Sequence, residues 1–213
     1  MLWQASSLFL VLVAQAQSQF NFGGHYGNPG YSVLSRCPLA ANPCRLRVEM
    51  RHSDGSILQS FHSQVCICNG GKSCSSDWSL TNRVIARNLH SATMNVTFDM
   101  LFCEDVSPRR VCSDGDIALE VSGSMLIPDQ LEHYHCRCID NRPLYLKERT
   151  TVNHRFHHKY VCRSHFQPCT TNSCMSTRSN SLTYNCECPS DKKCEYSILL
   201  SPRAQPEVYC TPR

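Results

Sequence analysis

The stretch that decides the fold spans residues 66–74 and reads Cys66-Ile67-Cys68-Asn69-Gly70-Gly71-Lys72-Ser73-Cys74. Its first two cysteines are separated by one residue, so in an extended backbone both side chains point to the same face. The Cα separation that a disulfide needs disfavours a bond between them. Each is therefore predicted to bond a different neighbouring segment, which fastens one strand to two others. The Asn-Gly-Gly that follows predicts a turn.

The same spacing recurs further along the chain. Two more C-x-C pairs stand at 136–138 and 186–188. The pairs at 66–68 and 186–188 each follow a close pair of cysteines. Each is itself followed, after five intervening residues, by another cysteine and then by a single closing cysteine. The 16 cysteines thus divide into blocks of six, four and six, and all are predicted to form disulfides: Cys37, Cys44, Cys66, Cys68, Cys74 and Cys103; Cys112, Cys136, Cys138 and Cys162; Cys169, Cys174, Cys186, Cys188, Cys194 and Cys210.

These blocks predict three tandem modules: a cysteine-rich module at 37–103, a central four-cysteine module at 112–162, and a second cysteine-rich module at 163–213. Complete pairing is the expectation for an even cysteine count in an oxidising compartment. Each native bridge contributes about 2–4 kcal/mol. The connectivity within each block stays open, because many pairings satisfy the same spacing.

The fold class predicted is a small disulfide-rich, mostly β protein built from tandem short-stranded modules. Apolar residues alternate along Arg45–Arg51, and Asn95–Phe102 also reads as a strand. Asp54-Gly55 predicts a hairpin turn. The segment Leu80–Leu89 has room for two or three helical turns at most. Strand-forming residues precede each C-x-C pair, at 60–65, 132–135 and 182–185.

The N-terminal residues predict secretion. Leu8–Ala14 is a short apolar run, followed by Ala14-Gln15-Ala16, which is typical of a signal-peptidase site. We therefore expect a signal peptide at 1–16, with cleavage possible up to residue 18, rather than an N-terminal core helix. Residues 17–36 predict a flexible lead-in. The expected localisation is extracellular, without a membrane anchor.

The charge balance is mild, with 21 Lys and Arg against 17 Asp and Glu. A net charge of +4 is not typical of a nucleic-acid-binding protein. Basic residues do gather near the middle of the chain, and a basic surface is one way to contact a protein target. The candidate target-binding residues are Lys72, Arg83, Arg142, Lys147, Arg149, Arg155, Lys159 and Arg163.

No pattern of residues indicates catalysis. There is no G-x-S-x-G elbow or glycine-rich phosphate loop, and complete pairing leaves no thiolate nucleophile. His133 and His135 would share a strand face and could supply two zinc ligands, but solvated histidines are the favoured interpretation. Carboxylates near Cys103 and Cys112 match no calcium-loop spacing. We expect no enzyme activity, no metal site, no cofactor and no nucleic-acid partner.

Two single residues are candidates for other roles. Asn95-Val96-Thr97 is a glycosylation sequon, which secretion would make usable, so Asn95 is a predicted glycosylation site. Trp78 is the only tryptophan after the predicted signal peptide. It predicts either core packing of a small module, which is the favoured interpretation, or an anchor for a partner.

The residues from Cys66 to Trp78 resemble the C-x-C-x-G-G-x-x-C-x-x-x-W signature of the eleventh scoloptoxin family, the cysteine-rich proteins of centipede venoms. That resemblance is detailed over about a dozen residues. In the rest of the chain only the order of the cysteines and the recurrence of C-x-C pairs are similar. It implies a secreted venom protein. The same cysteine order is also similar to a wider set of arthropod secreted proteins, and distantly to giant-lens, an insect antagonist of a growth-factor receptor ligand.

Two functions follow as hypotheses. The first is a venom toxin that binds an extracellular target, such as an ion channel or receptor, through loops held by disulfides. The second is a secreted, ligand-binding regulator that resembles a growth-factor antagonist. A metal-dependent hydrolase is a weaker third hypothesis.

Overall fold

The computed structural model describes residues 34–52, 55–89, 95–124, 127–139, 143–194 and 207–212. The predicted signal peptide and nearly all of the predicted lead-in lie outside these ranges. The described residues are mostly β, which confirms the predicted fold class, and two short 3-10 turns are η1 (Asn69–Gly71) and η3 (Arg163–His165). Among them no helix has the length and apolar character needed to cross a membrane.

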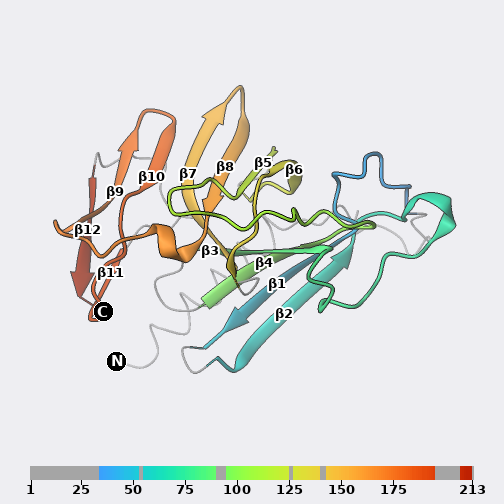
Figure 1. Ribbon diagram of the computed structural model, residues 1–213, viewed down its shortest axis with the longest axis horizontal. Coiled ribbons are helices and arrows are strands. Elements are labelled where there is room, and N and C mark those ends of the chain that lie inside the picture. The colour runs from blue at the N-terminus through green and yellow to red at the C-terminus, as the bar shows by residue number, and fades with distance from the viewer. Residues whose placement is uncertain are drawn as a thin grey trace, which may run out of the picture. The chain divides into compact units, whose positions relative to one another are not determined.

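Twelve strands occur within the described residues (Figure 1): β1 (Arg45–Arg51), β2 (Ile57–Gln64), β3 (Val84–Leu89), β4 (Asn95–Leu101), β5 (Leu119–Gly123), β6 (Gln130–Tyr134), β7 (Leu144–Val152), β8 (Arg155–Val161), β9 (Ser173–Arg178), β10 (Ser181–Tyr184), β11 (Lys192–Cys194) and β12 (Glu207–Pro212). The strand expected at residues 45–51 coincides with β1, and the one expected at 95–102 ends one residue earlier, as β4.

One strand-pairing pattern occurs three times along the chain. In the first repeat, β1–β4, the first strand pairs with the second and the fourth, and the third pairs with the fourth, all antiparallel. The central repeat, β5–β8, pairs in the same way. So does the third repeat, β9–β12. Each repeat therefore contributes four antiparallel strands, in the spatial order second, first, fourth, third, to one 12-stranded sheet.

Strand β7 joins the three repeats. It pairs with β3 of the first repeat in parallel and with β10 of the third repeat in antiparallel. The described residues from Ser35 onward belong to one compact unit, so the module limits expected at 37–103, 112–162 and 163–213 stay a prediction.

All sixteen cysteines form eight disulfides, and each disulfide lies within one cysteine block. In both six-cysteine blocks the first cysteine bonds the third, the second bonds the fifth, and the fourth bonds the sixth. The two members of each C-x-C pair bond different segments, as the backbone geometry predicts. The bridges are Cys37–Cys66, Cys44–Cys74, Cys68–Cys103, Cys112–Cys136, Cys138–Cys162, Cys169–Cys186, Cys174–Cys194 and Cys188–Cys210.

The C-x-C pairs lie just beyond the ends of β2, β6 and β10 rather than inside them. The middle residue of each pair instead forms a parallel bridge with the residue that precedes the first cysteine of its block. In the first repeat, Ile67 N–H donates to the Ser35 carbonyl at 2.9 Å, and Cys37 N–H donates to the Ile67 carbonyl at 2.9 Å. Arg36, placed in the lead-in by sequence, is thus part of this bridge.

The central repeat replaces one disulfide by buried hydrocarbon. The Ala118 carbonyl accepts a hydrogen bond from His135 N–H, as the Cys44 carbonyl does from Val65 N–H and the Cys174 carbonyl from Asn185 N–H. Leu144 follows Cys138 by six positions, the same spacing that separates Cys68 from Cys74 and Cys188 from Cys194. Ala118 is 0% exposed and Leu144 is 2% exposed. By hydrogen bonding and by spacing, we infer that the two residues correspond to the missing second and fifth cysteines.

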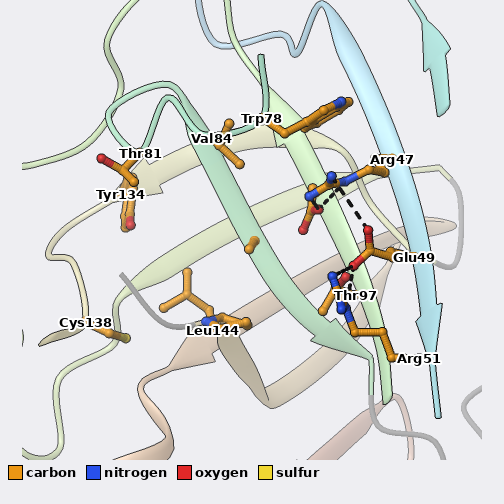
Figure 2. Close-up of a pocket in the computed structure, with 13 residues that line it drawn as sticks. Arg47, Glu49, Arg51, Trp78, Thr81, Val84, Thr97, Tyr134, Cys138 and Leu144 are labelled. Carbon is orange, nitrogen blue, oxygen red and sulfur yellow. Dashed lines mark hydrogen bonds and ion pairs between the residues drawn. The ribbon is translucent and has the colours of Figure 1, made fainter. Parts of the chain in front are cut away.

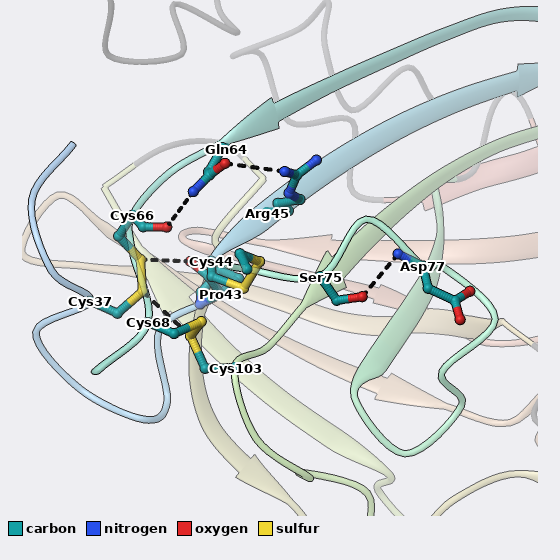
Figure 3. Close-up of a disulfide and its surroundings, with 11 residues drawn as sticks. Cys37, Pro43, Cys44, Arg45, Gln64, Cys66, Cys68, Ser75, Asp77 and Cys103 are labelled. Carbon is teal, nitrogen blue, oxygen red and sulfur yellow. Dashed lines mark hydrogen bonds between the residues drawn. A yellow bond between two sulfur atoms is a disulfide. The ribbon is translucent and has the colours of Figure 1, made fainter. Parts of the chain in front are cut away.

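Sulfur makes up much of the core of the first repeat. Its buried cluster contains five cysteines and Leu101, with Trp78 and Val84 packed against it. Figure 3 shows two disulfides of this region, Cys37–Cys66 and Cys68–Cys103, close together. The helix for which Leu80–Leu89 had room does not form, because Val84–Leu89 is β3 and Ile85 is buried in its sheet.

The glycines of η1 are required by the backbone: Gly70 and Gly71 have φ values of 75° and 72°, which L side chains rarely adopt.

A buried arginine links the first and central repeats. Arg87 of β3 is 0% exposed and lies over the rings of Phe98 and Tyr160, at 4.6 and 5.3 Å from their centroids. Its Nη1 donates to the Pro128 carbonyl at 2.7 Å. His158 is also buried, with Nδ1 3.1 Å from the Tyr160 hydroxyl oxygen. Arg87 and His158, which can both carry a positive charge, are therefore buried close to each other.

The central repeat should accept the disulfide that the other two repeats have and it lacks. We predict that the double variant Ala118→Cys/Leu144→Cys forms a ninth bridge and raises the free energy of unfolding by about 3 kcal/mol, because the bridge closes a loop of the unfolded chain. Thiol titration and peptide mapping would detect the bridge. Each single variant should retain one free thiol. Two free thiols in the folded double variant would show that these positions do not correspond.

The buried histidine predicts sensitivity to acid. Burial, together with the positive charges of Arg87, Arg149 and His157, holds the pKa of His158 well below its usual value of 6.5. The unfolded chain then binds a proton that the folded chain resists, so stability is full above about pH 6.5 and decreases as the pH falls below it.

We expect wild-type protein with intact disulfides to lose about 2 kcal/mol more than His158→Phe between about pH 6.5 and pH 5, in guanidinium unfolding. His62→Phe, at an exposed position, is the matched control and should follow the wild type. Equal pH slopes for wild type and His158→Phe would contradict the role of His158.

Candidate functional site

A pocket of about 280 Å³ opens where β1, β3 and β4 of the first repeat approach the start of β7 (Figure 2). Figure 2 shows Arg47, Glu49 and Arg51 along one side, with Val84 and Leu144 facing them from the other. The pocket is thus half polar and half apolar. Its polar lining is Arg47, Glu49, Arg51, Thr81, Thr97, Asp99 and Tyr134, and its remaining lining is Trp78, Val84, Ala86, Cys138, Pro143 and Leu144.

Four charged side chains form one line of ion pairs along the polar side. Arg47 Nε donates to Asp99 Oδ2 at 2.7 Å, and Arg47 Nη2 lies 2.6 Å from the same oxygen. Arg47 Nη1 lies 3.7 Å from Glu49 Oε2. Arg51 Nε donates to Glu49 Oε1 at 2.6 Å. Two positive and two negative charges therefore compensate each other within the pocket.

Asp99 lies at the inner end of this line. Side-chain exposure is 3% at Asp99 and 7% at Glu49, and it rises to 24% at Arg47 and 41% at Arg51. Burial raises the pKa of Asp99 above its usual value of 3.8, an effect that Arg47 opposes. Asp99 Oδ1 is buried and has no hydrogen-bond partner among the described residues. Asp99 therefore depends on Arg47 to compensate its buried charge.

Trp78 has the packing role that the sequence favoured, and its role as an anchor for a partner stays a prediction. It is half-buried and packs against the disulfide cluster of the first repeat. It also lines the pocket, where the Arg47 guanidinium lies 4.6 Å from its ring centroid. Packing against the disulfide cluster holds the Trp78 ring in place, and the cation–π contact with Arg47 orients the arginine towards Asp99.

Sequence reasoning did not find the charged residues of this pocket. The signal was present in β1, where the residues between the apolar Leu46, Val48 and Met50 are charged. Alternating charge on a strand is ordinarily a solvated face, so the pattern alone gave no reason to expect burial. Glu49 is nevertheless 5% exposed and Asp99 2% exposed.

The predicted basic target-binding residues are mostly occupied by partners within the chain. Arg83 pairs with Asp105 at 3.0 Å, Lys159 with Glu148 at 3.2 Å, and Arg163 with Glu187 at 2.5 Å. The described residues therefore do not gather these basic groups into one unpaired cationic surface.

The other basic candidates are spread over several surroundings. Arg155 donates to Ser122 and Gln130, each at 3.0 Å. Lys147 lies over the Phe166 ring, and burial lowers its pKa. Lys72 is exposed and Arg149 is half-buried in β7. Arg142 lies outside the described residues.

The histidines and carboxylates considered for metal binding have other contacts. His133 and His135 have ring centroids 5.5 Å apart, and His135 Nε2 lies 2.9 Å from Glu120 Oε1. Asp116 accepts hydrogen bonds from Arg110 and from Ser113 N–H. Among the described residues, the clusters of three close metal-ligating side chains consist of disulfide-bonded cysteines. Asn95 begins β4 opposite Arg51, and its side chain lies outside the described part of the chain.

Comparison with known proteins adds a distant likeness of architecture. No protein-family model and no curated protein matches the chain. The crystal structure of unliganded Argos is similar to this fold, with a TM-score of 0.40 and 16% sequence identity. That match covers 84% of this chain and 92% of the Argos chain. The eight disulfides independently indicate a protein that folds in an oxidising, extracellular-type environment.

The ion pairs predict unequal effects of two similar substitutions. Arg47→Gln would leave buried Asp99 without its compensating charge, so we expect it to lower the free energy of unfolding by about 3 kcal/mol. Arg83→Gln removes an exposed pair and should cost less than about 1 kcal/mol. Guanidinium unfolding with intact disulfides measures both. A loss at position 47 no larger than that at position 83 would contradict the buried network.

Proposed function

We propose that this protein is an extracellular binding protein that holds a second protein against its disulfide-fastened sheets and catalyses no reaction. The observation that carries the proposal is the pocket beside Trp78, where a line of ion pairs lies opposite an apolar wall and the disulfide cluster packs against the tryptophan. Rigid surfaces lose little conformational entropy on binding, which favours affinity.

The pocket is too small to be the whole contact. A stable protein interface covers about 800 Å² on each partner, whereas a pocket of about 280 Å³ has the size of one anchoring group. Anchoring side chains near the centre of an interface supply most of the binding energy. The pocket therefore fits the role of an anchor site within a wider contact.

Of the two partner classes that the sequence suggests, we propose a secreted growth-factor-type ligand. A toxin that enters a cation-selective pore would need a concentrated positive surface, because electrostatic attraction steers such an encounter. Here Arg83, Lys159 and Arg163 are each paired with a carboxylate. The proposal agrees with the similarity in cysteine order to giant-lens.

A venom protein that binds a channel or receptor is the second candidate. The residues from Cys66 to Trp78 favour it, because they resemble the signature of the eleventh scoloptoxin family. The site of synthesis separates the two candidates. A transcript confined to the venom gland would support the venom protein, and a transcript in general tissue would support the regulator.

Direct binding tests the proposal. We expect the secreted, disulfide-intact protein, immobilised on a sensor surface, to bind a recombinant arthropod epidermal-growth-factor-like ligand with a Kd below about 1 μM. Reduced and alkylated protein, which cannot keep the sheets in place, is the control and should not bind. Equal responses from both forms, or none from the intact form, would contradict a growth-factor partner. Stoichiometric zinc whose removal abolishes a hydrolytic activity would contradict a purely binding role.

A further inference from the structure

We propose that the outer edge of β2 pairs antiparallel with the same edge of a second copy of this chain, so that the two sheets join into one. The two-fold axis of this dimer passes through Phe61, near the middle of β2. The inference goes beyond the proposed function, because no residue of β2 lines the pocket beside Trp78.

Strand β2 lies at one end of the strand order and, among the described residues, pairs with β1 alone (Figure 1). Val65, one residue beyond β2, donates its N–H to the Cys44 carbonyl, so the odd-numbered residues direct their backbone groups towards β1. The N–H and C=O groups of Ser60, His62 and Gln64 therefore point away from β1. Such an edge is a template for another strand.

The other strands that pair on one side only, within the described part of the chain, have features that prevent further pairing. Strand β11 has three residues, two of which are lysine, and lysine blunts an edge. Strand β6 contains Glu132, and Leu131 N–H donates to the Ala41 carbonyl at 3.4 Å on its outer side. Strand β2 has eight residues and contains no Lys, Arg, Asp, Glu, Pro or Gly. Its one register shift against β1 lies at its first residues.

The third repeat already uses the equivalent edge. Strand β10 is the second strand of that repeat, as β2 is of the first, and it pairs antiparallel with β9 on one side and with β7 on the other. The second strand of a repeat can therefore accept an antiparallel strand on its outer side while it stays paired within its own repeat.

The sequence of β2 suits pairing with itself. Residues opposite each other can exchange hydrogen bonds only where both point their backbone groups outward, so Ser60 must face an even-numbered residue of the second copy. An axis through Phe61 places Ser60 opposite His62 and Gln59 opposite Ser63, which are polar pairs. It also places Phe61 opposite its own copy, and aromatic pairs across strands are stabilising. No like charges meet.

The two ends of β2 carry exposed apolar side chains that match across the same axis. Ile57 is 56% exposed, and Val65 is 41% exposed. The axis through Phe61 brings Ile57 of one copy to the side of Val65 of the other, at both ends of the contact. Shifting the axis by one residue would lose this match. Because covering apolar surface favours association, the distribution of these residues favours a second copy over an unrelated strand.

The dimer presents both pockets on one face of the joined sheet. Arg47 and Glu49 of the pocket lie opposite His62 and Ser60 in the pairing of β1 with β2, so these four residues share a face. A two-fold axis perpendicular to the joined sheet keeps that face on the same side in both copies. One bivalent partner can then contact both pockets, which raises its overall affinity.

The oligomeric state of the folded, disulfide-intact chain tests the proposal. We expect sedimentation equilibrium to show a monomer–dimer equilibrium with a Kd below about 100 μM, since the contact is small. Ser60→Pro removes an outward N–H and keeps those that bond β1, so it should raise this Kd at least about tenfold. Ser60→Ala keeps the outward N–H, and as the matched control it should dimerise like the wild type. An absence of free thiols shows that each variant is folded.

Two charge variants test the position of the axis. Phe61→Lys and Phe61→Glu each place like charges opposite each other, so each alone should be monomeric. A mixture of the two should form a heterodimer, because opposite charges then meet. This pair of variants also covers the case in which Ser60→Pro does not fold.

A wild-type chain that stays monomeric about tenfold above that Kd, a dimer that Ser60→Pro leaves intact, or a mixture of the charge variants that stays monomeric would overturn the inference. A monomeric wild type whose binding to the epidermal-growth-factor-like ligand is weakened by Ser60→Pro would assign the edge to a strand of the partner instead. A dimer that binds no such ligand would contradict the proposed function alone.

Discussion

The structure depends on two sulfur atoms being carried by one extended segment, two residues apart. In every repeat the C-x-C pair sends one bond to the segment that enters the repeat and one to the segment that leaves it. The middle residue adds a parallel backbone bridge to the entering segment. Three segments distant in sequence are thereby fixed at one point, which limits the conformational entropy that the short strands must overcome to pair.

The repeats differ in the contact that they add to the two disulfides of the C-x-C pair. The first and third add a bridge between the second and fifth cysteines, whereas the central repeat has buried Ala118 and Leu144 at those places. The central repeat also contains Tyr160, Val121 and Leu119, all nearly fully buried. Strand β7, which begins at Leu144, is further held by its pairing with strands of all three repeats. We infer that this additional pairing lets hydrocarbon replace the bridge there.

The pocket is a consequence of the same arrangement. The disulfide cluster of the first repeat packs against Trp78. The parallel pairing of β3 with β7 brings Pro143 and Leu144 to the wall of the pocket opposite the charged side chains. The register of β1 against β4 sets Arg47 opposite Asp99. Trp78, Pro143 and Leu144 cover this face and so lower the exposure of Glu49 and Asp99. Because they are buried, the ion pairs of these two carboxylates with Arg47 and Arg51 contribute more to stability than the exposed pairs elsewhere.

The sequence by itself determined the fold class, the complete use of the cysteines and the rule that the two cysteines of a C-x-C pair bond different segments. These follow from local geometry, since residues two apart share a face of an extended chain and the Asn69–Gly71 turn needs backbone angles that glycine supplies. Only the tertiary structure decided which cysteines pair, that Val84–Leu89 is a strand, and that Asp99 ends in a pocket. Each of those depends on which segments meet in space. The alternating charges of β1 would be the same in the sequence if their face were exposed to water, so the sequence does not reveal that Trp78 and the start of β7 cover it.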